Sequence, residues 1–192
     1  MYNKQTTQNN VRRSVASDQT IEVPESIGNA LRAVPPKPYT DSLVQNFFEN
    51  VNYHYGAMHQ PSFMMSYVEW WVQRRTTHRS LDMDMIVFTC LVLRICASSA
   101  QFLKSDLVER LEAELCESVE SLSSRYQTAA QILSDCVPPG EGGLFQVQQL
   151  FLSATWQKAE AEFAKSWHTL AAAVRAAQEI SKPFRPRSSS QC

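Results

Sequence analysis

The stretch MIVFTCLVLRICA, residues 85–97, is the longest nearly apolar run in the chain, and it contains one charged residue, Arg94. A run of this length falls short of the roughly 20 apolar residues that a membrane-spanning helix needs. A helix that is apolar nearly all round is normally surrounded by other parts of the fold. We therefore predict that residues 82–103 form a buried central helix in a soluble protein.

Glycine and proline, which interrupt helices, lie in short zones on either side of this run. No proline occurs between Ser62 and Val137 or between Gly140 and Lys182. Long stretches without these residues favour helices, and no alternating apolar pattern indicates a strand. The predicted fold class is all-α, as an irregular bundle of about five to six helices.

Apolar residues at helical spacing outline the other members of the bundle. Besides the central helix, we expect helices over residues 43–55, 62–73, 105–133 and 144–180. Ser42 and Gln45 have capping-box spacing at the first of these helices, and Ser62 is the expected cap of the second. The sequence CVPPGEGG, residues 136–143, predicts a loop. The last helix is unusually long, so we expect it to break at residues 159–162.

The two ends of the chain have a different composition from the middle. Residues 1–35 contain one aromatic residue, Tyr2, among many polar residues, which is typical of a disordered arm or linker. The basic, serine-rich tail KPFRPRSSSQC, residues 182–192, also predicts disorder. We therefore expect one folded domain over residues 36–181.

The charge balance argues against a nucleic-acid-binding protein. Eighteen Lys and Arg residues are matched by nineteen Asp and Glu residues, for a formal net charge of -1. Free-standing DNA- and RNA-binding domains carry positive surfaces that neutralise phosphates, so we expect no direct nucleic-acid binding by this chain alone. Charged residues make up 19% of the sequence, below the roughly 25% of typical domains. This deficit indicates a partly apolar surface that contacts a partner.

The five cysteines form no CxxC pair, and the chain does not start with a basic segment followed by an apolar one. Both features disfavour secretion and make a reducing compartment the default. Cys90 and Cys96 lie six residues apart, so they point away from each other on a helix, and we interpret them as packing residues.

No constellation for catalysis or metal binding stands out. The four histidines have neither HExxH spacing nor an i,i+4 pair. Asp82 and Asp84 stand at the start of the central helix, where carboxylates favour the positive end of the helix dipole, so capping is preferred to a metal site. We also find no nucleophile elbow. The sequence therefore predicts no catalytic residues, no metal, no cofactor and no enzyme.

Aromatic residues are the remaining candidates for a binding site. Tyr67, Trp70 and Trp71 share a helical face, and with Trp156 and Trp167 they are candidate contacts for an apolar ligand or a partner. Their helical spacing favours an ordinary role in the core over a role in a pocket.

One block carries a recognisable order of residues. The segment PPKPYTDSLVQNFFENVNYHYGAMHQPSFMMSYVEWW, residues 35–71, has a paired-phenylalanine helix followed by Asn52, a histidine–proline turn at His59, and Phe63. This order resembles the opening of the fungal-specific transcription factor domain, the middle homology region of zinc cluster regulators.

A second block, QLFLSATWQKAEAEFAKSWHTLAAAVRAAQEI, residues 149–180, is similar to later helices of the same family. It contains Trp156, Trp167 and an A-x-R-x-A-Q segment with Arg175 and Gln178. The resemblance implies an all-α regulatory domain of a nuclear activator of metabolic or secondary-metabolite genes. It implies structural roles for the motif residues and no reaction.

Two departures from the family pattern change the expected function. The family's zinc cluster needs six cysteines in two CxxC-led groups, and no cysteine precedes Cys90. Family members also continue well beyond the A-x-R-x-A-Q helix, whereas here a tail follows Ile180. We therefore expect a fragment or short form of such a regulator that lacks the DNA-binding zinc cluster. Truncation would leave apolar helix faces exposed, so we expect self-association or a protein partner.

Two alternatives remain open. The first is an all-α module that binds a small apolar ligand, and the second is an accessory enzyme of fungal secondary metabolism. The resemblance implies a nuclear location; without it, the sequence would indicate a cytoplasmic protein that is neither secreted nor membrane-bound.

Overall fold

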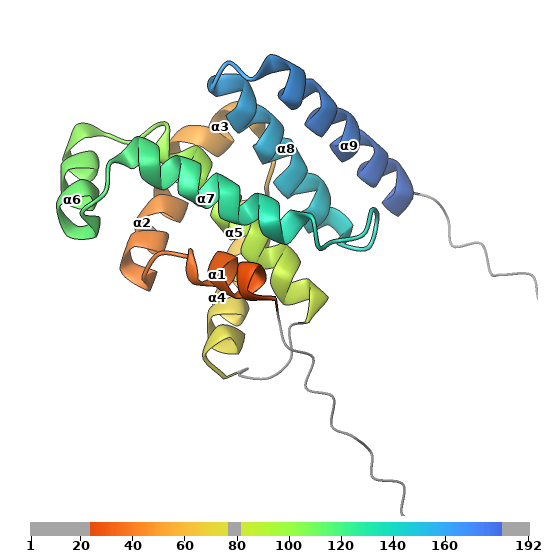
Figure 1. Ribbon diagram of the computed structural model, residues 1–192, viewed down its shortest axis with the longest axis horizontal. Helices are drawn as coiled ribbons and strands as arrows, with labels where there is room; N and C mark the ends of the chain where they lie inside the picture. The colour runs from red at the N-terminus through yellow and green to blue at the C-terminus, as the bar shows by residue number, and fades with distance from the viewer. Residues whose placement is uncertain (1–23, 77–81, 182–192) are drawn as a thin grey trace, which may run out of the picture.

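The computed structural model of the chain describes residues 24–76 and 82–181, and every regular element in these ranges is helical (Figure 1). The elements are α1 (Glu25–Arg32), α2 (Lys37–Asn46), the π-helical segment η1 (Phe47–Val51), α3 (Asn52–Tyr55), α4 (Gln60–Thr76), α5 (Met83–Ala100), α6 (Ser105–Leu115), α7 (Val119–Ser134), α8 (Gly143–Ala159) and α9 (Phe163–Ser181). The predicted all-α class is confirmed. The bundle has more helices than the five to six expected.

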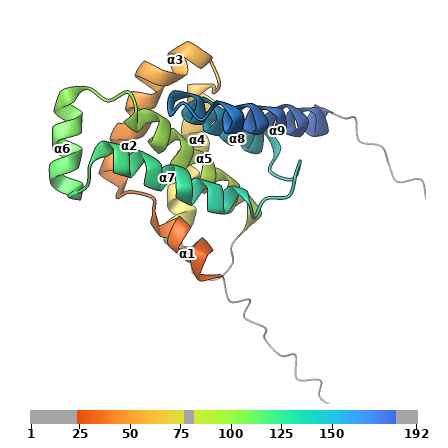
Figure 2. The ribbon, with the colours of Figure 1, turned by 45° about the horizontal axis from the view of Figure 1, so that its top comes forward.

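The central helix of the bundle is α5. Every side chain from Ile86 to Ala100 is buried, and α2, α7 and α8 pack around it (Figures 1 and 2). Each fully buried Leu, Ile or Val contributes roughly 1.5–3 kcal/mol relative to an exposed one, so this helix supplies much of the core. The predicted central helix is confirmed, although it ends at Ala100 and not at residue 103. Asp82 takes the N-cap position, but its side chain makes no capping hydrogen bond.

The same helix meets the length and composition expected of a membrane span, but 83% of it is buried inside the bundle. The buried core helix of a folded protein has the same properties. Among the described residues α5 is the one helix of this kind.

Arg94 is buried at the middle of α5 with 1% of its surface exposed. Its guanidinium donates hydrogen bonds to the Gln127 carbonyl oxygen at 3.2 Å and to Gln131 Oε1 at 2.9 Å. A third bond reaches Gln149 Oε1 on α8 at 3.4 Å. These oxygens carry no formal charge, so burial lowers the pKa of Arg94 below its usual range.

Helix α1 corrects the predicted disorder of residues 1–35. It packs against α7, and Ala30 and Val34 are buried there. The Arg74 guanidinium on α4 also donates to the Leu31 carbonyl oxygen at 2.6 Å. Four apolar residues at i, i+3, i+4 and i+7 spacing form the buried face. Residues 1–35 are polar on average, so their composition did not reveal this face. The folded part therefore begins about ten residues earlier than expected.

The rest of the predicted arm, residues 1–23, lies outside the described residues, and so does the predicted tail, residues 182–192. Expectations about disorder in those two segments stay predictions.

The first predicted helix differs in its start and its regularity. Helix α2 begins at Lys37, because the prolines beside it fit a first helical turn, where no backbone donor is required. Ser42 lies inside α2 and donates to the Pro38 carbonyl oxygen at 3.0 Å, so the predicted cap is wrong. The helix then widens into η1 before α3. Likewise α4 begins at Gln60, two residues before the predicted cap Ser62.

The long fourth helix is two helices, α6 and α7, separated at Cys116. This residue adopts a left-handed conformation with φ of 52°, which ends α6. The Ser118 side chain then accepts a hydrogen bond from the Ser121 backbone N–H at 3.3 Å and caps α7. Apolar spacing continues across the break, and for that reason the sequence pattern did not reveal it.

The predicted break in the last helix is confirmed. Ala161 has a φ of 60°, and the Glu162 N–H donates to the Gln157 carbonyl oxygen at 2.8 Å. The Ala161 N–H donates to the Lys158 carbonyl oxygen at 3.1 Å. Together these two bonds form a Schellman motif, which turns the chain so that α9 runs back along α8.

Candidate functional site: a cleft between α2 and α4

A cleft of about 500 Å³ lies between α2 with η1 on one side and α4 on the other. We refer to it as the α2–α4 cleft. Its walls are mostly apolar, with polar groups near the rim. The lining residues are Lys37, Asp41, Val44, Gln45, Phe48, Gln60, Met64, Tyr67, Val68, Trp71, Val72 and Arg75.

The α4 wall exists because this helix has two apolar faces. Phe63, Tyr67 and Trp70 recur at i, i+4 and i+7 and are buried in the core. Met64 and Val68, one position further along, face the cleft and remain 37% and 61% exposed. A helix that is apolar on its solvent side as well as its core side marks an interaction surface.

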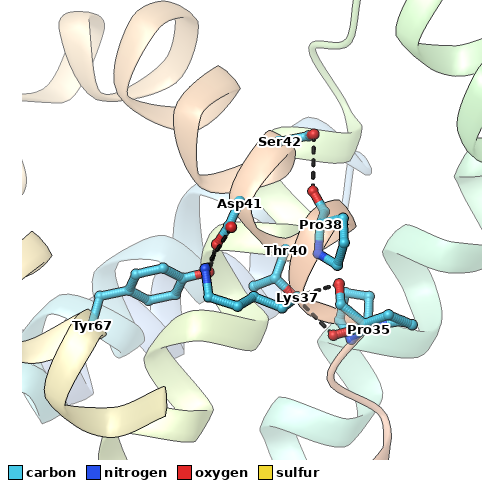
Figure 3. A network of polar contacts seen from close by, with 8 residues as sticks. Pro35, Lys37, Pro38, Thr40, Asp41, Ser42 and Tyr67 are labelled. Carbon is cyan, nitrogen blue, oxygen red and sulfur yellow. Dashed lines mark hydrogen bonds and ion pairs between the residues drawn. The ribbon is translucent and has the colours of Figure 1, made fainter. Parts of the chain in front are cut away.

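Asp41 is held in place at the cleft by two donors, as Figure 3 shows. The Tyr67 hydroxyl, reaching from α4, donates to Asp41 Oδ1 at 2.7 Å. The Lys37 ammonium donates to Asp41 Oδ2 at 2.6 Å. Since the lysine and aspartate side chains are about half exposed, the ion pair adds little stability. Its effect is to fix the orientation of the carboxylate.

The Tyr67 phenol remains protonated over the physiological range. Burial raises its pKa far above the ordinary value; Asp41 adds to the rise, whereas the Trp71 indole opposes it. The indole N–H lies near the phenol oxygen but is buried without a hydrogen bond of normal geometry. Lys37 Nζ lies 5.9 Å from the centroid of the Trp71 ring, within cation–π range. The polar groups of the cleft are therefore suited to positioning a bound group.

The five predicted aromatic candidates do not form one site. Tyr67, Trp70 and Trp71 do lie together, with ring centroids 5.9 Å apart for the first pair and 4.8 Å apart for the second. Trp156 is buried elsewhere and donates to Ser123 Oγ on α7 at 2.9 Å. Trp167 is 72% exposed on α9. The structure therefore does not bring all five into one pocket, and their role as contacts stays a prediction.

Trp70 serves the core and not the cleft. Its indole N–H donates to Thr89 Oγ1 on α5 at 2.9 Å, and its side chain is 3% exposed. Of the predicted candidates, Tyr67 and Trp71 line the cleft.

Three residues of the first sequence block make local contacts near the start of α4. Asn52 stabilises the turn after α3 with two hydrogen bonds. Its Nδ2 donates to the Met58 carbonyl oxygen at 2.9 Å, and its Oδ1 accepts from the Met58 N–H at 3.0 Å. His59 Nδ1 lies 2.8 Å from Ser62 Oγ at the start of α4. Phe63 is buried and stacks on Tyr67.

The two residues of the second block are placed differently. Arg175 and Gln178 are both exposed on α9. The resemblance implies a structural role for both residues, and that role stays a prediction.

Sequence reasoning missed part of the cleft and one whole surface. The i,i+4 spacing of Lys37 and Asp41 was visible in the sequence, but their link to Tyr67 depends on how α2 and α4 pack. On α9, Phe163, Trp167 and Val174 are exposed on one side. A search for seven-residue spacing would have revealed that side.

Metal and thiol chemistry receive little support in the described ranges. In residues 24–76 and 82–181, no three or more His, Cys, Asp or Glu side chains gather where they could hold a metal ion. Cys90 and Cys96 are fully buried in α5, as expected of packing residues. Burial raises the pKa of the Cys90 thiol to about 11, so it stays protonated.

Two curated proteins align with most of the chain. "Probable transcription factor sol4" of Alternaria solani is 29% identical over 152 residues, covering 78% of this chain and 26% of that protein. "Transcription factor xilB" of Penicillium rubens is 27% identical over 161 residues, covering 81% of this chain and 23% of that protein. The chain thus spans about a quarter of the length of these curated relatives. Both support a fungal transcription-factor family and a role in transcription regulation.

No protein-family model matches the chain. No solved structure matches it either. The support for a transcription-factor family therefore comes from the two full-length relatives.

Proposed function

We propose that these residues form the regulatory domain of a fungal transcription regulator and contain no DNA-binding module. The domain acts in the nucleus by contacting another protein through the α2–α4 cleft, and it catalyses no reaction. Two relatives named as transcription factors support the regulatory role. The cleft, with an apolar wall on the solvent side of a core helix, is the observation that carries the proposed contact.

The shape and charge of the cleft suit an amphipathic helix. Met64, Val68 and Trp71 form an apolar wall, and a methionine-containing surface adapts to different partners. Lys37 and Arg75 stand at the rim, with Asp41 already bound to Lys37. A partner helix with acidic residues beside its apolar face would complement this rim.

Two features of the sequence support the absence of a DNA-binding module from these residues. The sequence has a net charge of -1, and its cysteines form no CxxC pair of the kind a zinc cluster uses. The target genes implied by the resemblance are metabolic or secondary-metabolite genes, and they remain part of the proposal.

A tethered reporter tests the proposed contact. The chain is fused to an unrelated DNA-binding domain in a fungal host, and output from a reporter gene is compared with that of the DNA-binding domain alone. We expect the fusion to change the output, and Val68→Glu to abolish the change because a charge in the cleft wall cannot be desolvated cheaply. Val174→Glu makes the same change on α9 and should leave the response intact. Equal responses from wild type and Val68→Glu would contradict the cleft assignment.

A second candidate function rests on the volume of the same cleft. About 500 Å³ lies within the range of small-molecule sites, so a small apolar ligand is the alternative occupant. A ligand that binds only the folded chain raises its thermal stability. Thermal-shift screening of hydrophobic metabolites against wild type and Val68→Glu therefore separates the two functions.

A further inference from the structure

Helix α8 buries a row of polar side chains, which we call the polar row: Gln146, Gln149, Ser153 and Gln157. These residues are spaced by three, four and four positions, so they line up along one side of the helix. Glutamine and serine are mostly exposed in folded proteins, and a helix normally turns its apolar side inward. The polar row is therefore an unusual inner surface for a helix of this length.

The neighbouring helix α7 is packed differently. Six of its eight buried residues are apolar, whereas only three of the seven buried residues of α8 are apolar. Both helices pack on α5. Burial of apolar surface is the main favourable contribution to packing, so α7 is attached to α5 more firmly than α8 is.

The polar row forms hydrogen bonds with side chains of α5 and α7. Gln149 Oε1 accepts from Arg94 Nε at 3.4 Å, and Gln149 Nε2 donates to Ser134 Oγ at 2.9 Å. Ser153 Oγ accepts from Gln127 Nε2 at 3.1 Å. Such bonds are replaced by bonds to water when two helices separate, so their net contribution to the attachment of α8 is small.

Two buried acceptors would gain hydrogen bonds on separation. One is Oε1 of Gln127 on α7, and the other is Oε1 of Gln157, one turn beyond Ser153 in the polar row. Neither accepts a hydrogen bond within the described part of the chain. Water would satisfy both atoms once α8 moved away. The closed interface therefore carries a cost that an open one lacks.

Helix α9 is attached to the bundle through α8, on which it packs (Figures 1 and 2). At this contact Ser166 Oγ of α9 donates to the Ala154 carbonyl oxygen at 2.8 Å. The loop before α8 is also held by that helix, because Gln146 Nε2 donates to the Pro138 carbonyl oxygen at 3.0 Å. The loop, α8 and α9 thus form one packed unit, residues 138–181.

The helices of the α2–α4 cleft have their own contacts with α5. Trp70 Nε1 of α4 donates to Thr89 Oγ1 at 2.9 Å, and the rings of Phe63 and Phe88 stack with their centroids 5.5 Å apart. Helix α2 packs on α5 as well. The cleft would therefore keep its walls if residues 138–181 moved.

We propose that residues 138–181 open away from α5 and α7 as one cooperative unit, while α2, α4, α5 and α7 stay packed. Opening exposes Leu152 and Trp156 and separates the rings of Phe88 and Phe145, whose centroids lie 5.1 Å apart, so the open state is a minor one. The polar row makes this state accessible without global unfolding. The inference goes beyond the proposed function and can fail without it, since it uses no residue of the cleft.

Native-state hydrogen exchange of the purified full chain, measured by mass spectrometry over a series of low urea concentrations, tests the opening. We expect the amides of α8 and α9 to share one opening equilibrium and to exchange more than about tenfold faster than those of α5 without urea. Exchange of α8 only together with α5 would overturn the proposal. So would exchange of α9 through an opening that leaves α8 protected.

The double variant Gln127→Leu with Ser153→Ala tests the role of the polar row. It replaces both partners of a buried hydrogen bond and removes one unpaired acceptor, so it leaves no new polar group unpaired. We expect it to slow exchange of α8 and α9 by more than about tenfold relative to α5. The control, Gln60→Leu with Ser124→Ala, makes the same changes at exposed positions and should keep the wild-type rates. Wild-type rates in the first double variant would overturn the role given to the polar row.

Discussion

Arg94 links α5 to α7 and α8 through hydrogen bonds. Its guanidinium binds the Gln127 carbonyl oxygen and Gln131 Oε1 on α7, and Gln149 Oε1 on α8. A buried charge costs several kcal/mol unless hydrogen bonds compensate for its lost hydration. An alignment that moved either helix by one turn would leave the guanidinium short of partners. We therefore expect Arg94 to contribute more to a unique packing arrangement than to stability.

Glu117 gives the domain a pH dependence that can be measured. It accepts hydrogen bonds from Ser121 Oγ at 2.6 Å and from Arg125 Nε at 3.1 Å, and it precedes the N-terminus of α7. The hydrogen bond from Ser121 is the largest cause of its lowered pKa, and Arg125 adds to the effect although partial burial opposes it. A lowered folded pKa stabilises the fold above the unfolded pKa of about 4.3. That contribution is lost as the pH falls through the folded pKa.

We therefore expect wild type to lose more unfolding free energy than Glu117→Gln between pH 6 and pH 3, by urea denaturation at fixed protein concentration. Glu109→Gln, an exposed glutamate on α6, is the control and should keep the wild-type dependence. The same slope in wild type and Glu117→Gln would show that the hydrogen bonds of Glu117 do not contribute.

At the level of single residues, the sequence identified types of role but not partners. Arg94 stood out as the one charge in an apolar run, and Cys90 and Cys96 were expected to be packing residues. The oxygens that bind Arg94 come from two other helices, so they depend on the packing of the bundle. Trp167 and Trp71 were both candidate contacts for a ligand or a partner, yet Trp167 is largely exposed and Trp71 lines the cleft.

At the level of the helices, the helix ends determine the path of the chain. The break between α8 and α9 uses Ala161 at a position where glycine is usual. A left-handed conformation costs a residue with a Cβ roughly 1–2 kcal/mol, and Ala161 has a φ of 60°. The packing of α9 against α8, which this turn allows, offsets the strain.

Ala161→Gly should raise the unfolding free energy by about 1 kcal/mol, since glycine adopts this conformation without strain. The matched change Ala172→Gly, in the middle of α9, should lower it by about 1 kcal/mol. Chemical denaturation of the two variants beside wild type measures both effects. A decrease in both would mean that the conformation of Ala161 carries no strain.

The sequence predicted elements better than their boundaries. Apolar spacing located α4, α5 and the α8–α9 break, because each has a long run without glycine or proline or a clear excess of length. It failed at α1, whose short apolar face was lost in a polar segment, and at Cys116, where a non-glycine residue ends a helix. Such a break depends on local conformation and caps, which apolar spacing does not record.

At the scale of the whole molecule, two surfaces remain available after the core is complete. The α2–α4 cleft combines an apolar wall with a fixed carboxylate, whereas the exposed face of α9 carries the apolar side chains of Phe163, Trp167 and Val174. Each lies on a helix whose other side packs in the bundle. The low fraction of charged residues indicated a contact surface in general terms. Their locations follow from which helix faces the tertiary packing leaves exposed.

The proposed function requires the α2–α4 cleft to bind a regulatory protein in the nucleus. A photo-reactive amino acid placed at Val68 in fungal cells, followed by mass spectrometry of the cross-linked products, tests it most directly. We expect a defined nuclear regulatory protein to be joined at residue 68 through an amphipathic segment, and no such product from the exposed control position Glu109 on α6. The same products from both positions, or none from Val68, would show that the cleft does not bind such a protein.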